Sequence, residues 1–248
     1  MPWARMWAFM QTWMVPIESR HRASGERLTM PLGTTVPMDR AFATLRQFAR
    51  ARRRAERCEL CSLELGREHP HLIEIASRQI VCACDACATL FDAMAGARYR
   101  RVSRRVQLLA DFQMADAEWD SLLIPINMAF FFRSSVEGRV IALYPSPAGA
   151  VESLLPLDAW DAIVERNAIL EHLGPDIEAL LANRVGVGRK LSHAEYYIAP
   201  IDECYRLVGL IRANWKGLSG GSEVWTEIAR FFADLRSRAD VVSGEAHA

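Results

Sequence analysis

Short apolar runs rich in β-branched and aromatic residues recur through residues 106–248, and this pattern predicts β-strands. The runs lie at 106–112, 119–133, 139–144, 176–184 and 196–201. The second run would bend at Pro125, and a turn at residues 136–138 joins it to the third, which predicts an antiparallel hairpin. The run at 176–184 fits a helix or a strand. We assign a strand because a glycine-rich turn and a clear strand follow it.

Other segments show the three-to-four-residue apolar spacing of amphipathic helices. They lie at 40–57, 89–95, 157–173, 202–215 and 223–238. Asp158, Asp202 and Ser222 stand at the starts of the last three, where short polar side chains cap free backbone N–H groups. Hairpins followed by helices predict an α+β fold, with a mainly antiparallel sheet and helices packed on one face of it.

The patterns divide the chain into four parts. Residues 1–37 are expected to be a tail, either flexible or an artefact of gene annotation, because residues 23–37 are rich in Ser, Gly, Thr and Pro. Residues 38–105 hold a basic helix and a cysteine-rich metal-binding module. Residues 106–240 form the α+β domain, and residues 241–248 are expected to be a loose tail.

Composition and charge narrow the class of protein. The 248 residues are 51% hydrophobic and 24% charged, which suits a folded core. No stretch approaches the ~20 apolar residues of a membrane span, and we expect a cytoplasmic protein. The net charge of +0 hides an asymmetry: residues 1–105 hold 18 Arg against 10 Asp and Glu (+8), and residues 106–248 hold 12 Lys and Arg against 20 (−8). The two halves attract each other, or each faces a different partner.

Two C-x-x-C motifs, Cys58-Glu-Leu-Cys61 and Cys84-Asp-Ala-Cys87, are separated by 22 residues and form the strongest chemical signal. Two residues between thiolates let one tight turn direct both sulfurs at one ion. Two such turns, joined by a hairpin, complete a tetrahedron with Zn–S bonds of about 2.3 Å. We predict a zinc-ribbon or rubredoxin-like module with Cys58, Cys61, Cys84 and Cys87 as ligands. Structural Zn²⁺ is the first choice and a rubredoxin-like iron the alternative, because the spacing does not distinguish them, and an iron–sulfur cluster is the third choice.

Cys82 and His71 are reserve ligands for the same ion. Cys82 precedes Cys84 by two positions, so on a strand both side chains face the same way. His69 and His71 lie in the intervening loop, where a histidine more often supports a metal site than ligates it. Disulfides are the weaker explanation, since nothing indicates export and five clustered thiols leave one unpaired. A closed four-cysteine site indicates a structural role.

The second half of the chain offers no catalytic constellation. His193 with Glu195 and His172 with Asp176 are conceivable acid–base pairs, but surface histidines are far more common. Cys204 lies within a predicted helix and is expected to be a buried apolar thiol. We therefore assign no catalytic residue and do not expect an enzyme.

Several strings together resemble an uncharacterised bacterial family, a domain of unknown function, between about residues 38 and 238. They include Arg57-Cys-Glu-Leu-Cys61, His69-Pro-His71-Leu72, Cys82-Ala-Cys84-Asp-Ala-Cys87 and Pro200-Ile-Asp202. Members of the family are encoded beside high-affinity [NiFe]-hydrogenase genes. The resemblance implies a role in assembling, maturing or wiring the hydrogenase and supplies no catalytic residues. Family members often have Gly after the first C-x-x-C, where this chain has Ser62, and a Gly would ease the turn.

Three functions follow from these observations. The leading hypothesis is a metal-binding accessory protein that docks on a protein partner, such as a hydrogenase subunit or maturation factor. The first alternative is a rubredoxin-like iron electron carrier for a hydrogenase. The second is a nucleic-acid-binding regulator that uses the arginines of the 40–57 helix, Arg46, Arg50, Arg52, Arg53, Arg54 and Arg57. Nucleic acid is the less expected partner, because no recognition motif accompanies these arginines.

Overall fold

The computed structural model describes residues 56–92, 96–153, 157–185, 193–217 and 220–243. All of them belong to one compact unit. The expected tail at 1–37 and residues 40–55 of the expected basic helix lie outside the described residues. The last two positions of that helix are described and are not helical, because Arg57 forms an antiparallel bridge with Glu64.

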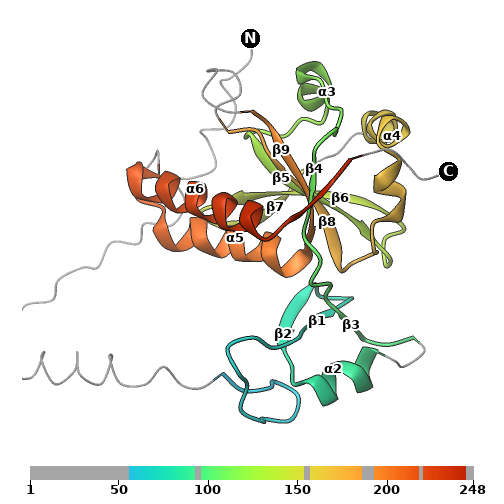
Figure 1. Ribbon diagram of the computed structural model, residues 1–248, viewed down its shortest axis with the longest axis vertical. Coiled ribbons are helices and arrows are strands. Elements are labelled where there is room, and N and C mark those ends of the chain that lie inside the picture. Colours follow the sequence, from blue (N-terminus) through green and yellow to red (C-terminus); the bar gives the residue numbers. More distant parts are fainter. Residues whose placement is uncertain (1–55, 93–95, 154–156, 186–192, 218–219, 244–248) are drawn as a thin grey trace, which may run out of the picture. The chain divides into compact units, whose positions relative to one another are not determined.

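Seven strands among the described residues form the larger sheet, in the order β10-β4-β9-β8-β5-β6-β7 (Figure 1). The strands are β4 (Gln107–Leu109), β5 (Met128–Ser134), β6 (Arg139–Ser146), β7 (Gly149–Glu152), β8 (Glu178–Asn183), β9 (Glu195–Pro200) and β10 (Asp240–Val242). Neighbours are antiparallel except β10 and β4, which are parallel. The α+β class with a mainly antiparallel sheet is confirmed, as is the strand at 176–184.

Helices cover both faces of this sheet (Figure 1). The helices α5 (Ile201–Asn214) and α6 (Gly221–Ser237) share a core with one face. The other face packs against α3 (Asp116–Ser121), α4 (Leu157–Arg166) and the 3₁₀ helix η1 (Ala168–His172). The expectation of helices on one face was wrong. In β5, Phe130 and Phe132 face α5 and α6 while Phe131 faces α4, so both surfaces must be covered.

A smaller module precedes the sheet. It contains β1 (His71–Glu74), β2 (Gln79–Cys82), α2 (Asp85–Asp92) and β3 (Tyr99–Arg101), with the antiparallel strand order β2-β1-β3. Side chains of successive residues in β1 point to opposite faces and are buried in different cores. Leu72 packs in the module's own core, whereas Ile73 joins the core of the larger sheet together with Val102. The module is therefore packed on the sheet through shared apolar residues.

Two segments differ from the helix and strand pattern predicted from the sequence. Residues 119–133 are not one strand: α3 ends at Ser121 and β5 begins at Met128. The Glu118 carboxylate accepts the Ala115 N–H at 2.7 Å and so stabilises the start of α3. The helix expected at 157–173 ends at Arg166, because the Asn167 amide bonds to the carbonyls of Gln113 and Ile163 and turns the chain into η1.

The ends of the last elements also differ. The expected caps Asp202 and Ser222 do not cap, since α5 begins at Ile201 and α6 at Gly221, preceded by Gly220 in the left-handed region with φ 85°. The loose tail expected from residue 241 is not observed at its first two positions. Val241 and Val242 belong to β10 and pair with Leu108 and Leu109 of β4.

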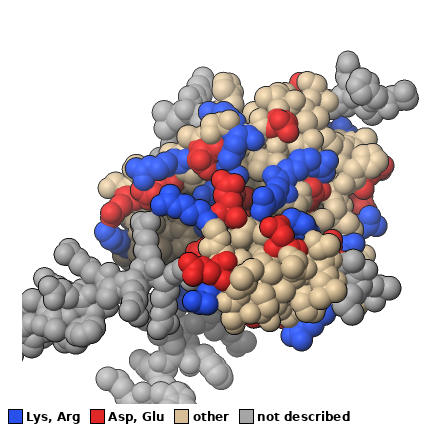
Figure 2. Space-filling model, turned by 60° about the horizontal axis from the view of Figure 1, so that its bottom comes forward, with Lys and Arg blue, Asp and Glu red and all other residues tan. Residues whose placement is uncertain are grey.

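Opposite charges from the two halves of the chain meet in ion pairs. The pairs join Arg78 to Glu137 and Glu152, Arg100 to Asp176, and Arg105 to Glu178. Figure 2 shows basic and acidic side chains interleaved over one face of the molecule. Part of the charge asymmetry of the sequence is therefore used within the fold, which supports the first of the two alternatives.

Candidate metal centre

The first C-x-x-C motif lies in a tight turn ahead of the hairpin. The Cys58 N–H donates to the carbonyl of Leu63 at 2.8 Å, and the Ser62 N–H donates to the carbonyl of Cys58 at 2.7 Å. Ser62 has φ 64°, in the left-handed region that favours glycine. The sequence expectation that this position would suit a glycine is confirmed. A further hydrogen bond connects this turn to the end of β2: the Glu59 N–H donates to the carbonyl of Cys82 at 2.9 Å.

The second motif lies at the start of α2. Cys84 immediately precedes the helix, and Cys87 is in its first turn, where its N–H donates to the Cys84 Sγ at 3.5 Å. The helix expected at 89–95 begins earlier, at Asp85, and residues 93–95 lie outside the described residues. The motif thus differs from the second turn expected of a zinc ribbon. A helix N-terminus favours thiolates because its N–H groups carry partial positive charge.

The four sulfur atoms of Cys58, Cys61, Cys84 and Cys87 lie within 4.8 Å of one another. The Cys61 and Cys84 sulfurs are 3.7 Å apart. Tetrahedral bonds of about 2.3 Å place ligand sulfurs about 3.8 Å apart, whereas a disulfide requires about 2.05 Å. All the cysteines are free. The cluster therefore has the spacing of a metal site and not of disulfides.

Backbone groups and burial act in opposite directions on the Cys58 thiol. Burial opposes ionisation of Cys58, but the N–H groups of Cys84, Cys61 and Leu60 outweigh it and lower the pKa of its thiol to about 6. Burial raises the pKa of Cys87 to about 12, with further contributions from the neighbouring thiols. Ionisation of Cys87 beside these thiols therefore requires added positive charge, which a divalent cation supplies.

The reserve ligands Cys82 and His71 belong to a different group. With His69, they place three ligand atoms within 4.8 Å of one another, separately from the four-cysteine cluster. His69 was not among the ligands predicted from the sequence. The signal available in the sequence was the His-x-His spacing at the entry to β1, the strand that pairs with the strand ending at Cys82.

The conceivable acid–base pairs are not formed. The Glu195 carboxylate bonds to Asn183 and Arg236. The Asp176 carboxylate accepts the Ser135 N–H at 2.9 Å and lies 3.6 Å from Arg100. Both carboxylates are thus engaged in structural contacts. Cys204 is fully buried, as expected, and burial raises the pKa of its thiol well above its ordinary value.

Within the described part of the chain, no helix has the length and apolarity needed to cross a membrane. Fold and site together define an α+β protein with a four-cysteine cluster able to hold a metal ion. Residues 57–239 match the family of unknown function DUF5947, and the chain belongs to this family. No curated protein and no solved structure matches the chain. The expectation of an uncharacterised domain family is confirmed, and the link to hydrogenase genes stays a prediction.

Proposed function

We propose that the protein is a metal-stabilised accessory protein that acts by protein–protein interaction. One zinc ion bound by Cys58, Cys61, Cys84 and Cys87 organises its small module. The observation that carries the proposal is the convergence of these four sulfurs within 4.8 Å of one another. Four thiolates occupy every position of a tetrahedral ion, which leaves no position for a substrate.

The small core of the module favours a structural role for the ion. Its buried residues include two of the proposed ligands, Cys58 and Cys84, together with Leu72, Val81, Ala83 and Ala88. Without a bound metal ion or a disulfide, so few apolar side chains stabilise a fold only weakly. Binding of a metal to preformed ligands would add directly to the free energy of unfolding.

The partner is proposed from the family resemblance. A neighbour of [NiFe]-hydrogenase genes with a closed metal site and no assigned catalytic residue fits an accessory role. The protein would dock on a hydrogenase subunit or maturation factor in the cytoplasm. This part of the proposal is independent of the metal's identity and needs its own test.

Elemental analysis of anaerobically purified protein tests the metal. We expect zinc in a colourless protein, and replacement of Cys61 by Ser should remove one equivalent and lower the melting temperature. The matched control is Cys204→Ala, which changes a buried thiol outside the cluster and should keep the metal content. A Cys61→Ser variant with full metal content would contradict the proposed site. Metal loss without loss of stability would contradict the structural role.

An absorption spectrum and an affinity-capture experiment distinguish the proposed function from its alternatives. A red protein with a visible thiolate-to-iron absorption band would replace zinc by iron and favour an electron carrier. Affinity capture with the full chain, under reducing and anaerobic conditions, should recover a hydrogenase subunit or maturation factor. Recovery of neither in cells that express the hydrogenase would contradict the accessory role.

A further inference from the structure

The second group of ligand-type side chains comes from the β1–β2 hairpin, which carries His71 and Cys82, and from His69, two residues ahead of β1. His71 and Cys82 are directly opposite each other in the antiparallel register of the two strands. Opposed residues in such a pair project from the same face of the sheet. The rings of His69 and His71 meet edge to face, with centroids 4.9 Å apart. The hairpin and the segment ahead of it therefore hold two imidazoles and a thiol at one place.

One ring nitrogen of His69 is buried without a hydrogen-bond partner among the described residues. Its side chain is only 7% exposed. The Nδ1 atom lies 3.0 Å from the carbonyl of Gly66, which accepts its proton. The Nε2 atom is buried and has no hydrogen-bond partner among the described residues. Buried polar atoms are nearly always satisfied, so this imidazole nitrogen, beside a histidine and a thiol, is free to bind a cation.

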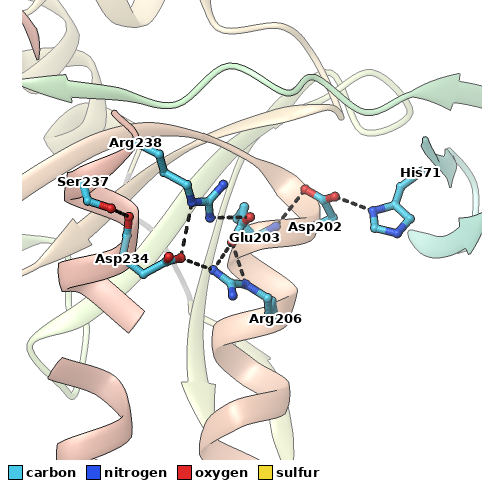
Figure 3. A network of polar contacts seen from close by, with 7 residues as sticks. All are labelled: His71, Asp202, Glu203, Arg206, Asp234, Ser237 and Arg238. Atoms are coloured by element: carbon cyan, nitrogen blue, oxygen red, sulfur yellow. Dashed lines mark hydrogen bonds and ion pairs between the residues drawn. The ribbon is translucent and has the colours of Figure 1, made fainter. Parts of the chain in front are cut away.

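His71 is oriented by a carboxylate. Its Nδ1 donates to Asp202 Oδ2 at 2.6 Å, at the start of α5, which leaves Nε2 as the ligand atom (Figure 3). A carboxylate bonded to the outer nitrogen is the usual support of a metal-binding histidine. Figure 3 also shows how this end of α5 is held: Arg206 and Arg238 both bond to Glu203, at 2.7 and 2.6 Å.

We propose that Nε2 of His69, Nε2 of His71 and Sγ of Cys82 bind a second divalent transition-metal ion, of the kind that zinc represents. Two imidazoles and one thiolate suit this class of ion. Three protein ligands leave a fourth position for water or another ligand. A cavity of ≈ 410 Å³ that both histidines line gives that ligand room.

Zinc counting at saturation tests this site in the full chain. The protein is equilibrated with excess Zn²⁺, freed of unbound metal and analysed. We expect two zinc ions per chain in the natural protein and one in Cys82→Ser or His69→Ala. His193→Ala, an exposed histidine outside the group, is the control and should keep two. Asp202→Asn should keep the count at saturation but weaken the second affinity about 10- to 100-fold, because the ligand loses its orienting carboxylate.

The two clusters share no residue, so their failures are distinguishable. Where circular dichroism shows that Cys61→Ser stays folded, this variant removes only the four-cysteine equivalent. A single zinc that is lost in Cys82→Ser but kept in folded Cys61→Ser would support this proposal and reject the four-cysteine site. Unchanged zinc counts in both Cys82→Ser and His69→Ala would overturn the second site. A single zinc that depends on Cys61 alone would also overturn it.

Discussion

The Arg105 Nη2 atom lies 3.1 Å from both carboxylate oxygens of Glu178, although 73 residues separate them in sequence. The Glu178 side chain is only 6% exposed, whereas that of Arg105 is half-exposed. One further donor, the Gly174 N–H at 3.1 Å, reaches the same carboxylate. The pair joins the segment after the small module to the first residue of β8.

Replacing Arg105 by Ala should destabilise the protein because it leaves a buried carboxylate without its counter-charge. Breaking a fully buried pair costs about 3–5 kcal/mol, and solvent around Arg105 reduces this to about 2 kcal/mol. Urea unfolding measures the change. Arg212→Ala is the control, since Arg212 is exposed and makes no ion pair with the described residues. Equal effects of the two substitutions would contradict a special role for the pair.

Tyr197→Phe should leave the stability unchanged or raise it by up to about 1 kcal/mol. The Tyr197 hydroxyl is buried and has no hydrogen-bond partner among the described residues, and burial raises the pKa of this phenol to about 12. Removing an unsatisfied buried hydroxyl lowers the desolvation cost of folding. The neighbouring Tyr196 is a matched control, because its hydroxyl accepts a bond from Arg184 at 2.5 Å.

Tyr196→Phe should cost about 1–2 kcal/mol, as expected for loss of a hydrogen bond to a charged donor. Thermal unfolding followed by circular dichroism compares the two substitutions on adjacent residues of one strand. A larger loss in Tyr197→Phe than in Tyr196→Phe would show that the Tyr197 hydroxyl has a partner that stabilises the fold.

Glu152 should titrate below 4.5, its ordinary pKa, because a hydrogen bond from Arg139 lowers the pKa of its carboxyl. A lowered carboxyl pKa contributes stability above pH 4.5, and that contribution is lost as the pH falls through the folded-state value. The side chain is 40% exposed, so the gain is small. Arg139→Gln should return the Glu152 pKa toward 4.5 in an NMR titration. Arg166→Gln should leave it unchanged.

Local spacing predicted the four-cysteine cluster, because a C-x-x-C motif fixes its own turn and needs only a hairpin to bring two turns together. Strand β8 was also predictable, from the turn and strand that follow it. The pairing of His71 with Asp202 was not, since contacts between residues 131 positions apart leave no local pattern. Strand β10 escaped prediction because three residues at a sheet edge are too short for a periodic signal.

The covering of both sheet faces was missed for a different reason. Residues of β5 are apolar almost without interruption, because both faces of the strand are buried. Such a run shows no alternation of apolar and polar residues from which the two faces could be recognised. Trp119 extended that run in the sequence, yet it belongs to α3, where Arg184 stacks 5.3 Å from its ring centroid. Helix and strand are indistinguishable by apolar content alone in so short a segment.

Ser62→Gly should raise the free energy of unfolding by about 0.5–1 kcal/mol. Ser62 adopts φ 64°, which costs an L-residue energy that glycine does not incur. The gain is partly offset by the greater flexibility of glycine in the unfolded chain. Ser135→Gly is the control. Ser135 does not have a positive φ, so the same change there should lower the stability of the protein. Chemical denaturation measures both, and a loss of stability in Ser62→Gly would contradict strain at this position.

Removal of metal by a chelator should open the small module before the larger sheet. The proposed ligands Cys58 and Cys84 form part of the module core, so their release leaves few buried apolar groups to hold β1, β2 and α2. Amide hydrogen exchange of residues 57–92 should accelerate at least tenfold, whereas β5 and β8, buried on both faces, should keep their protection. Ile73 is the exception to watch, because it packs into the core of the larger sheet and should anchor β1 longest. Uniform loss of protection across both regions would mean that module and sheet unfold as one cooperative unit.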